Sequence, residues 1–142
     1  MSSMKLHYDV DNTDFTRAGE ASRDTKKKLK LMGVSPEVVR KVAISMYEGE
    51  INMVIHANGG TIDVTISSDN IVLVLKDEGP GIANIDKAME AGYSTANENI
   101  RSLGFGAGMG LPNMKKYSDE MNVKSEIGVG TTVTITIYNE LT

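Results

Sequence analysis

The sequence predicts a two-layer α/β sandwich, in which helices cover one face of a mixed, mostly antiparallel sheet. Three observations indicate this fold class. A long stretch that begins at Ser35 has apolar residues at helical spacing, several shorter stretches alternate apolar and polar residues, and glycine-rich turns separate these segments. The predicted order is strand, helix, helix, two strands, helix, helix and two strands, which suits helices packed on a single sheet.

The amino-terminal part is predicted to form a strand and a helix. Apolar residues alternate with polar residues over 5–10, which is typical of a strand. Residues 14–32 have one apolar side at helical spacing, and Gly33 ends the helix. The lysine-rich run at 26–30 is more typical of a solvated helix face than of a phosphate or partner contact. The expected buried side of this helix consists of Phe15, Ala18, Ala21, Ser22, Thr25, Leu29 and Met32.

The longest predicted helix runs from Ser35 to a Gly-Gly pair. Ser35 can cap it, and Pro36 suits its first position because a backbone N–H has no helical partner there. Glu48, Asn52 and His56 are spaced by four residues and therefore lie along one polar edge. The expected packing stripe consists of Val38, Val39, Val42, Met46, Ile51, Val54 and Ile55.

The rest of the chain is predicted to add two strand pairs, two helices and a long loop. The strand at 71–76 is apolar on both sides, so it should lie inside the sheet. A hairpin turn at 68–70 joins it to the preceding strand. The predicted elements are strands at 61–67, 71–76, 123–127 and 132–138, helices at 85–91 and 111–121, and a mobile loop at 92–105.

Length and composition indicate one domain that spans residues 1–142. The chain has 15 Lys and Arg against 19 Asp and Glu, and its net charge of −4 argues against a nucleic-acid partner. No apolar run reaches the roughly 18 residues that span a bilayer, and the amino terminus lacks the hydrophobic segment of a signal peptide. The absence of cysteine excludes disulfides and thiol nucleophiles. We therefore expect a cytoplasmic protein with no membrane partner.

Alternate glycines precede the predicted helix at 111–121, at Gly104, Gly106, Gly108 and Gly110. Their backbone N–H groups and the helix amino terminus together favour binding of a phosphate. The spacing differs from the Walker pattern and from the dinucleotide-binding fingerprint. Considered alone, these glycines therefore fit a packing-driven turn equally well.

Asp77, Gly79 and Gly81 follow the strand that is expected to be central. A carboxylate at this point can accept a hydrogen bond from an exocyclic amine such as that of adenine. The glycines would allow a flat ring to approach the backbone. Considered alone, the pattern fits a capped turn without a ligand better.

Glu48 and Asn52 are the candidates for phosphate chemistry. The amide oxygen of Asn is a suitable hard ligand for Mg²⁺, and a Glu one turn earlier could orient or deprotonate a nucleophile near a terminal phosphate. In an isolated helix, the two residues would more often be polar groups on an exposed edge. His56 is more typical of a structural residue near a helix end than of a metal ligand.

The order of these motifs resembles the GHKL ATPase superfamily, which includes histidine-kinase catalytic domains, type II topoisomerase and heat-shock ATPase domains, and anti-sigma-factor serine kinases. The edge formed by Glu48, Asn52 and His56 is similar to the N box of the family. The segments 77–81 and 106–111 are similar to its two glycine boxes. Gly-Val-Gly-Thr, which ends at Thr131, matches its closing motif.

This resemblance implies a Bergerat fold that binds ATP and Mg²⁺. It implies that Asn52 holds the metal, that Asp77 binds the adenine amine and that Thr131 supports the base pocket. Residues 92–105 would form a lid over the phosphates. The remaining implied nucleotide-binding residues are Gly79, Gly81, Gly104, Gly106, Gly108, Gly110 and Leu111.

A chain of this length with Glu48, Asn52 and His56 at this spacing is most similar to the single-domain anti-sigma and stress-switch serine kinases of this family, whereas histidine-kinase domains usually carry Asn at the place of Glu48. The resemblance then implies transfer of the γ-phosphate of ATP to a serine of an anti-anti-sigma, STAS-type partner, with Glu48 as general base or aligner. A sigma factor or another regulator is a further implied partner, and this group includes homodimers. The Arg that some members carry before the second glycine box is absent, so Arg101 or Lys115 would have to reach the γ-phosphate.

Two other functions fit the same motifs. The first is a non-catalytic module in which ATP sets the conformation that grips a protein partner. The second is a histidine-kinase-like catalytic domain that acts in trans on a separate phosphoacceptor, which Glu48 disfavours. A Glu48 substitution separates the enzyme from the binding module, because only the enzyme needs this carboxylate after ATP has bound.

Overall fold

The structure is a computed structural model that describes residues 3–10, 17–56, 59–79 and 110–139. The helix expected at 85–91 and the lid expected at 92–105 lie outside these ranges. Within the described residues, five strands and three helices form two layers. None of the described helices combines the length and apolarity that a membrane crossing requires.

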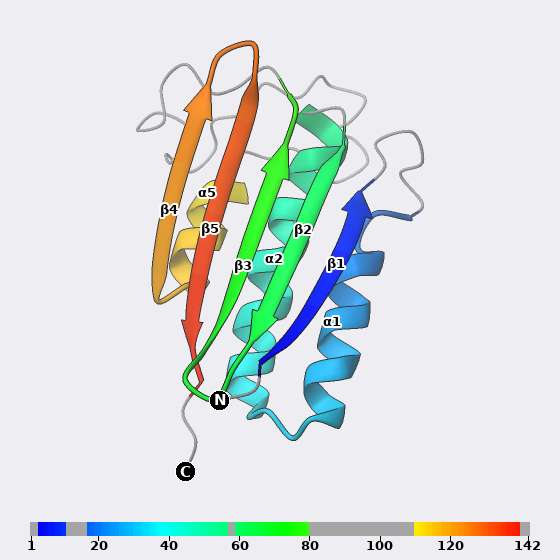
Figure 1. The fold of residues 1–142 in the computed structure, drawn as a ribbon, viewed down its shortest axis with the longest axis vertical. Helices are drawn as coiled ribbons and strands as arrows, with labels where there is room; N and C mark the ends of the chain where they lie inside the picture. Colours follow the sequence, from blue (N-terminus) through cyan, green and yellow to red (C-terminus); the bar gives the residue numbers. More distant parts are fainter. Residues whose placement is uncertain (1–2, 11–16, 57–58, 80–109, 140–142) are drawn as a thin grey trace.

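The strands in the described residues form one sheet, which is the first layer. Its described strands are β1 (Met4–Val10), β2 (Gly60–Ile66), β3 (Asn70–Asp77), β4 (Glu120–Glu126) and β5 (Gly130–Tyr138). They lie in the order β1-β2-β3-β5-β4, and each neighbouring pair is antiparallel (Figure 1). The predicted fold class is confirmed, with a described sheet that is antiparallel throughout and not mixed. β3 lies at its centre, as its apolar residues on both sides predicted.

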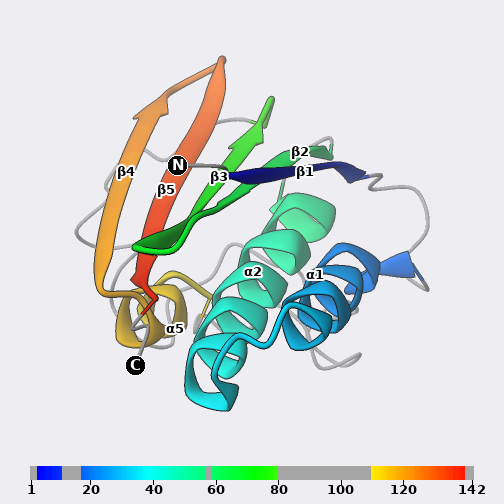
Figure 2. The ribbon, with the colours of Figure 1, turned by 60° about the horizontal axis from the view of Figure 1, so that its bottom comes forward.

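The three described helices form the second layer, and all of them cover the same face of the sheet (Figure 2). They are α1 (Glu20–Leu31), α2 (Pro36–His56) and α5 (Gly110–Tyr117). α2 lies between the other two and packs against both of them. It begins as predicted, because Ser35 Oγ accepts a hydrogen bond from the N–H of Val38 at 3.4 Å.

The core lies between α2 and the central strands. The most deeply buried large side chains come from the three described helices and from β2, β3 and β5. They are Leu29, Met46, Ile62, Ile71, Leu73, Met114, Ile135 and Ile137. α2 approaches β3 closely because residue 49 is glycine. A Cβ atom at Gly49 would overlap the Leu75 side chain and lie 3.2 Å from Met114 Cε.

Helix α1 is shorter than the predicted range of 14–32. Gly19 has a φ of +95°, which lies in the left-handed region, so the described helix begins at Glu20. It ends at Leu31, and Met32 is 46% exposed although it was predicted to be buried. Phe15 lies outside the described residues. Ala21, Ser22, Thr25 and Leu29 are buried as predicted, whereas Ala18 is half-buried and lies before the helix begins.

The helix predicted at 111–121 ends at Tyr117, and the prediction of its last four residues is wrong. The N–H of Asp119 donates to the carbonyl oxygen of Thr136 at 3.0 Å, and this bond connects the chain to the sheet. Met121 and Val123 then alternate with exposed residues in β4 and pack against the core. Strand periodicity therefore begins at Glu120 and not at Val123.

Candidate functional site

The end of the central strand β3 carries a carboxylate with two backbone donors. Asp77 Oδ1 accepts hydrogen bonds from the N–H of Gly79 at 2.9 Å and from the N–H of Thr131 at 3.1 Å. Both bonds go to the same oxygen, and Asp77 Oδ2 takes part in neither. The structure thus brings together two predicted site residues that are 54 positions apart in the sequence.

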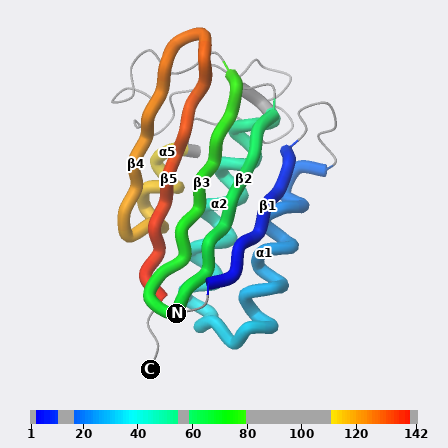
Figure 3. The backbone as a smooth tube through the Cα atoms, viewed as in Figure 1, coloured from blue at the N-terminus to red at the C-terminus, as the bar shows by residue number. Residues whose placement is uncertain are grey.

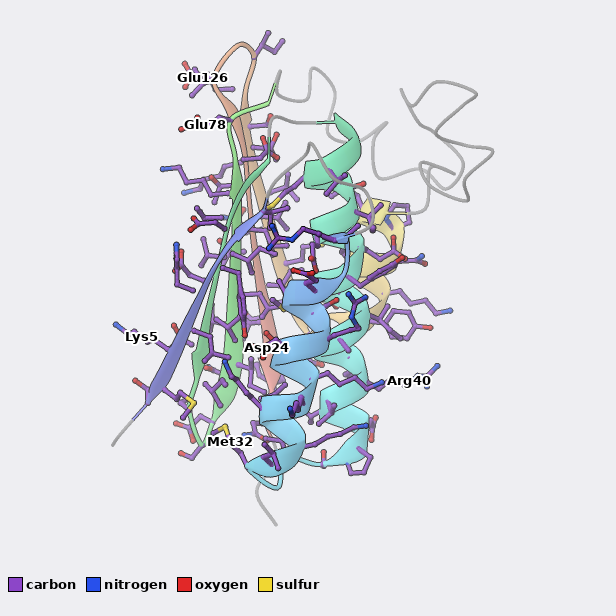
Figure 4. The ribbon with its side chains drawn as sticks, turned by 90° about the vertical axis from the view of Figure 1, so that its right-hand side faces the viewer. Lys5, Asp24, Met32, Arg40, Glu78 and Glu126 are labelled. Carbon is purple, nitrogen blue, oxygen red and sulfur yellow. The ribbon has the colours of Figure 1, made fainter. Side chains whose placement is uncertain are left out.

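The start of β5 lies directly against this strand end. Gly130 has a φ of +147°, and a Cβ atom there would overlap the carbonyl oxygen of Asp77 and lie 3.0 Å from its carbonyl carbon. The next residue, Thr131, is buried, and its hydroxyl is 2.8 Å from the Ser125 hydroxyl. In Figure 4, Glu78 and Glu126 mark this end of the sheet, which is opposite to Met32.

Gly130→Ala should lower the free energy of unfolding by about 2–4 kcal/mol, because the new methyl group combines backbone strain with overlap of the Asp77 carbonyl. Gly128→Ala is the matched control, since Gly128 has a φ of +81° but no neighbouring atom within 4 Å of the added Cβ. Gly128→Ala should lower the free energy of unfolding by about 1 kcal/mol. Chemical denaturation of both variants measures the difference. Equal losses would contradict close contact between β5 and the end of β3.

Glu48 lies on the side of α2 that faces α5. Its carboxyl group is half-buried, and Asn113 Nδ2 donates to Glu48 Oε1 at 3.2 Å. Burial raises the pKa of Glu48 above its ordinary value, and the hydrogen bond from Asn113 opposes this rise in part. A carboxylate with a raised pKa and an amide donor is suited to accept a proton.

The raised pKa of Glu48 makes a stability prediction. A carboxyl whose pKa is higher in the folded state favours folding at low pH, and this contribution is lost as the pH rises through the folded pKa. Glu48→Gln stays neutral, so its stability relative to the wild type should increase between pH 4 and pH 7. Thermal unfolding of both proteins across this range measures the effect. A difference that is constant with pH would contradict the burial argument.

Asn52 lies one helical turn beyond Glu48 and is half-buried. The end of α2 that carries both residues lies at the same end of the molecule as the start of β2 (Figure 3). Gly60, the first residue of β2, pairs with Asp77 in the sheet. The two predicted parts of the site, the polar edge of α2 and the end of β3, therefore lie toward the same end of the fold.

The other residues predicted for the site fall into two groups, those in the described part of the structure and those outside it. Gly79 is buried beside Asp77, Gly110 begins α5, and Leu111 belongs to the hydrophobic core. Lys115 is exposed in the last turn of α5. The predicted residues that lie outside the described part of the structure are Gly81, Arg101, Gly104, Gly106, Gly108 and the side chain of His56.

Two polar residues near the site were not predicted. Asn113 contacts Glu48, and its place in the first turn of the helix after the second glycine motif was the available signal. Glu50 is 2% exposed, although charged residues are rarely buried without partners. Glu50 lies between apolar residues of the packing helix. This position was the available signal for a carboxylate that points into the protein and needs hydrogen-bond donors.

Residues 51–140 match the family described as histidine kinase-, DNA gyrase B- and HSP90-like ATPases. The chain belongs to this ATPase family, which confirms the resemblance inferred from its motifs. The matched segment includes Asn52, Asp77 and Thr131.

Two curated relatives are similar to this chain over most of its length. The anti-sigma F factor of Thermoanaerobacter sp. (strain X514) is 37% identical over 102 residues, which cover 72% of this chain and 64% of that protein. The serine/threonine-protein kinase RsbT of Bacillus subtilis is 29% identical over 124 residues, which cover 84% of this chain and 85% of RsbT. The match thus spans just under two thirds of the first relative and most of the second.

The crystal structure of the RsbU and RsbW domains of Rv1364c from Mycobacterium tuberculosis has the same fold. It superimposes with a TM-score of 0.63 and 17% sequence identity, and the match covers 97% of this chain and 33% of that chain. At this identity the similarity concerns the fold alone.

Proposed function

We propose that this chain is a Mg²⁺- and ATP-dependent serine-protein kinase of the anti-sigma or switch type. Its substrate would be a serine of an anti-anti-sigma protein of the STAS type. The observation that carries the proposal is the half-buried Glu48, with its raised pKa and its Asn113 donor, one turn before Asn52. The names of the relatives, anti-sigma F factor and serine/threonine-protein kinase, support this choice.

Asp77 and Thr131 are proposed to hold the adenine. Asp77 Oδ1 is engaged by two backbone N–H groups, which would leave Oδ2 to accept from the exocyclic amine of the base. These two bonds fix the rotamer of the carboxylate before the nucleotide arrives. The Thr131 hydroxyl, 2.8 Å from Ser125, would line the same pocket.

The residues of α2 fit a magnesium ion in their donor chemistry. Asn52 offers an amide oxygen and Glu48 a carboxylate oxygen, and both side chains are half-buried on one face of the helix. We assign the metal contact to Asn52. When bound, Mg²⁺ would neutralise charge on the phosphate oxygens.

Glu48 would then act on the protein substrate. In the proposed step, a bond forms between the serine oxygen of the partner and the γ-phosphorus, and the bond from that phosphorus to the β-phosphate oxygen breaks, so that ADP leaves. The serine proton passes to the Glu48 carboxylate, whose raised pKa makes it a better acceptor than an ordinary Glu. Asn113 would keep this carboxylate oriented toward the serine.

A phosphotransfer assay tests the proposal. The purified protein is mixed with γ-labelled ATP, Mg²⁺ and a panel of STAS-domain anti-anti-sigma proteins, and label on serine is then identified by mass spectrometry. We expect phosphoserine on at least one panel member. ATP-dependent binding of a partner with no transfer of label would instead support the non-catalytic module. A sigma factor as a second partner and homodimerisation stay predictions of the family resemblance.

A further inference from the structure

One buried carboxylate in α2 has no role in the proposed chemistry. Glu50 is 2% exposed and lies between the two site residues Glu48 and Asn52 in the sequence. Each residue of an α-helix is rotated by about 100° from the one before it. Glu50 is therefore rotated by about 160° from each of these neighbours, toward the opposite side of the helix.

On that side, Glu50 binds the first turn of α1. Its Oε2 atom accepts from the N–H groups of Gly19 at 2.9 Å and Ala21 at 3.1 Å, and its Oε1 atom accepts from the N–H of Ser22 at 3.1 Å. The first N–H groups of a helix have no partners within the helix, and they attract an anion. The carboxylate thus satisfies three donors and is itself satisfied while buried.

Helix α1 has no side-chain cap of its own, because its capping residue is Gly19. A residue with a side chain would be strained there, because φ is +95° and a Cβ atom would lie 3.1 Å from Tyr47 Cε1. The cap is supplied instead by Glu50, from 31 residues further along the chain. The contact therefore caps the amino terminus of α1 and also joins α1 to α2.

Helix α2 is held on both sides by carboxylates that are two residues apart. Glu50 contacts α1, and Glu48 contacts Asn113 of α5. Rotation of α2 about its axis would separate Glu50 from three N–H donors and leave a buried charge without partners, which is costly. The same rotation would turn Glu48 away from Asn113 of α5, and Asn52, one turn further along the same edge of the helix, would turn with it.

We propose that Glu50 is a positioning residue, which fixes the rotation of α2 so that Glu48 and Asn52 face the bound nucleotide. This inference rests on the proposed function, because it assigns a task to the two site residues. The capping contact itself is independent of any ligand.

Glu50→Gln tests the proposal, with Leu29→Ala as the matched control. Leu29 is fully buried in α1, so its truncation destabilises the same helix without touching the Glu50 carboxylate. Titrations of ADP without Mg²⁺, and of ATP with and without Mg²⁺, are compared well below the melting temperature of each variant. We expect Glu50→Gln to bind metal-free ADP as tightly as the wild type does. The factor by which Mg²⁺ raises the affinity for ATP should be about tenfold smaller in Glu50→Gln than in the wild type. Leu29→Ala should keep that gain.

A second measurement needs no nucleotide. The side-chain amide signals of Asn113 in an NMR spectrum report its contact with Glu48, and amide exchange of Ala21 and Ser22 reports the cap. Glu50→Gln should shift the Asn113 signals and speed exchange of both amides, whereas Leu29→Ala should leave the Asn113 signals in place. If Glu50→Gln folds poorly, Glu50→Asp, which keeps the charge and shortens the reach, should give smaller changes in the same direction.

The outcomes separate the inference from the proposed function. If the wild-type protein binds no nucleotide, the kinase proposal fails, and the Asn113 signals alone decide the role of Glu50. Equal effects of Glu50→Gln and Leu29→Ala on the magnesium-dependent gain, or unshifted Asn113 signals in Glu50→Gln, would overturn the inference and reduce Glu50 to a stabilising cap.

Discussion

Asp77→Asn is expected to lower the affinity for both ATP and ADP by roughly 10- to 150-fold. The side chain accepts hydrogen bonds from Gly79 and Thr131 through one oxygen, and the proposed adenine contact uses the other. An Asn side chain has a single acceptor oxygen, so it cannot serve all three donors. The loss of one hydrogen bond to a charged group is worth about 1.5–3 kcal/mol, which converts to this range. Isothermal titration measures the affinity of both proteins.

The control for this variant is Asp63→Asn. Asp63 is an exposed carboxylate of β2 that pairs with His7 at 2.7 Å, and in the sheet it lies opposite Val74, three residues before Asp77. Its replacement should leave both affinities within about twofold. If Asp77→Asn bound both nucleotides as tightly as the wild type, the adenine would lie elsewhere.

Glu48→Gln should reduce the rate of phosphotransfer by about 10²- to 10⁴-fold, the range that general base catalysis supplies. Gln is nearly the same size as Glu and can still accept from Asn113, so the fold of the site should persist. Its amide cannot take the serine proton. ATP affinity should stay within about threefold of the wild type, because the base contacts made by Asp77 and Thr131 are unchanged. Single-turnover transfer of labelled phosphate, together with titration, separates the two quantities.

Glu37→Gln is the matched control for Glu48→Gln, since Glu37 lies in the exposed first turn of the same helix. It should change neither the transfer rate nor the affinity. Full phosphotransfer by Glu48→Gln would remove Glu48 from the chemistry. The non-catalytic module would be favoured if the wild type itself showed ATP-dependent partner binding and no transfer.

The sequence predicted those parts of the fold whose local pattern agrees with their tertiary surroundings. The central place of β3 followed from its apolar residues on both sides, and the start of α2 followed from Ser35 and Pro36. The segment after Tyr117 was predicted wrongly because Met121 fits both a helical and an alternating pattern. Its state is decided by hydrogen bonds to β5, which lies further along the chain.

The site shows a similar division. Asp77, Glu48 and Asn52 were found from short motifs, because their spacing along one strand end or one helix edge is local information. Asn113 and Glu50 act through partners that are 65 and about 30 residues away in the chain, respectively. Only the packing of α2 between α1 and α5 brings these partners together.

Isothermal titration of the wild-type protein with ATP and with ADP, each with and without Mg²⁺, tests the central claim most directly. We expect saturable binding of one nucleotide per chain, with ATP bound more tightly when Mg²⁺ is present. Absence of binding by either nucleotide would contradict a nucleotide site between α2 and the end of β3.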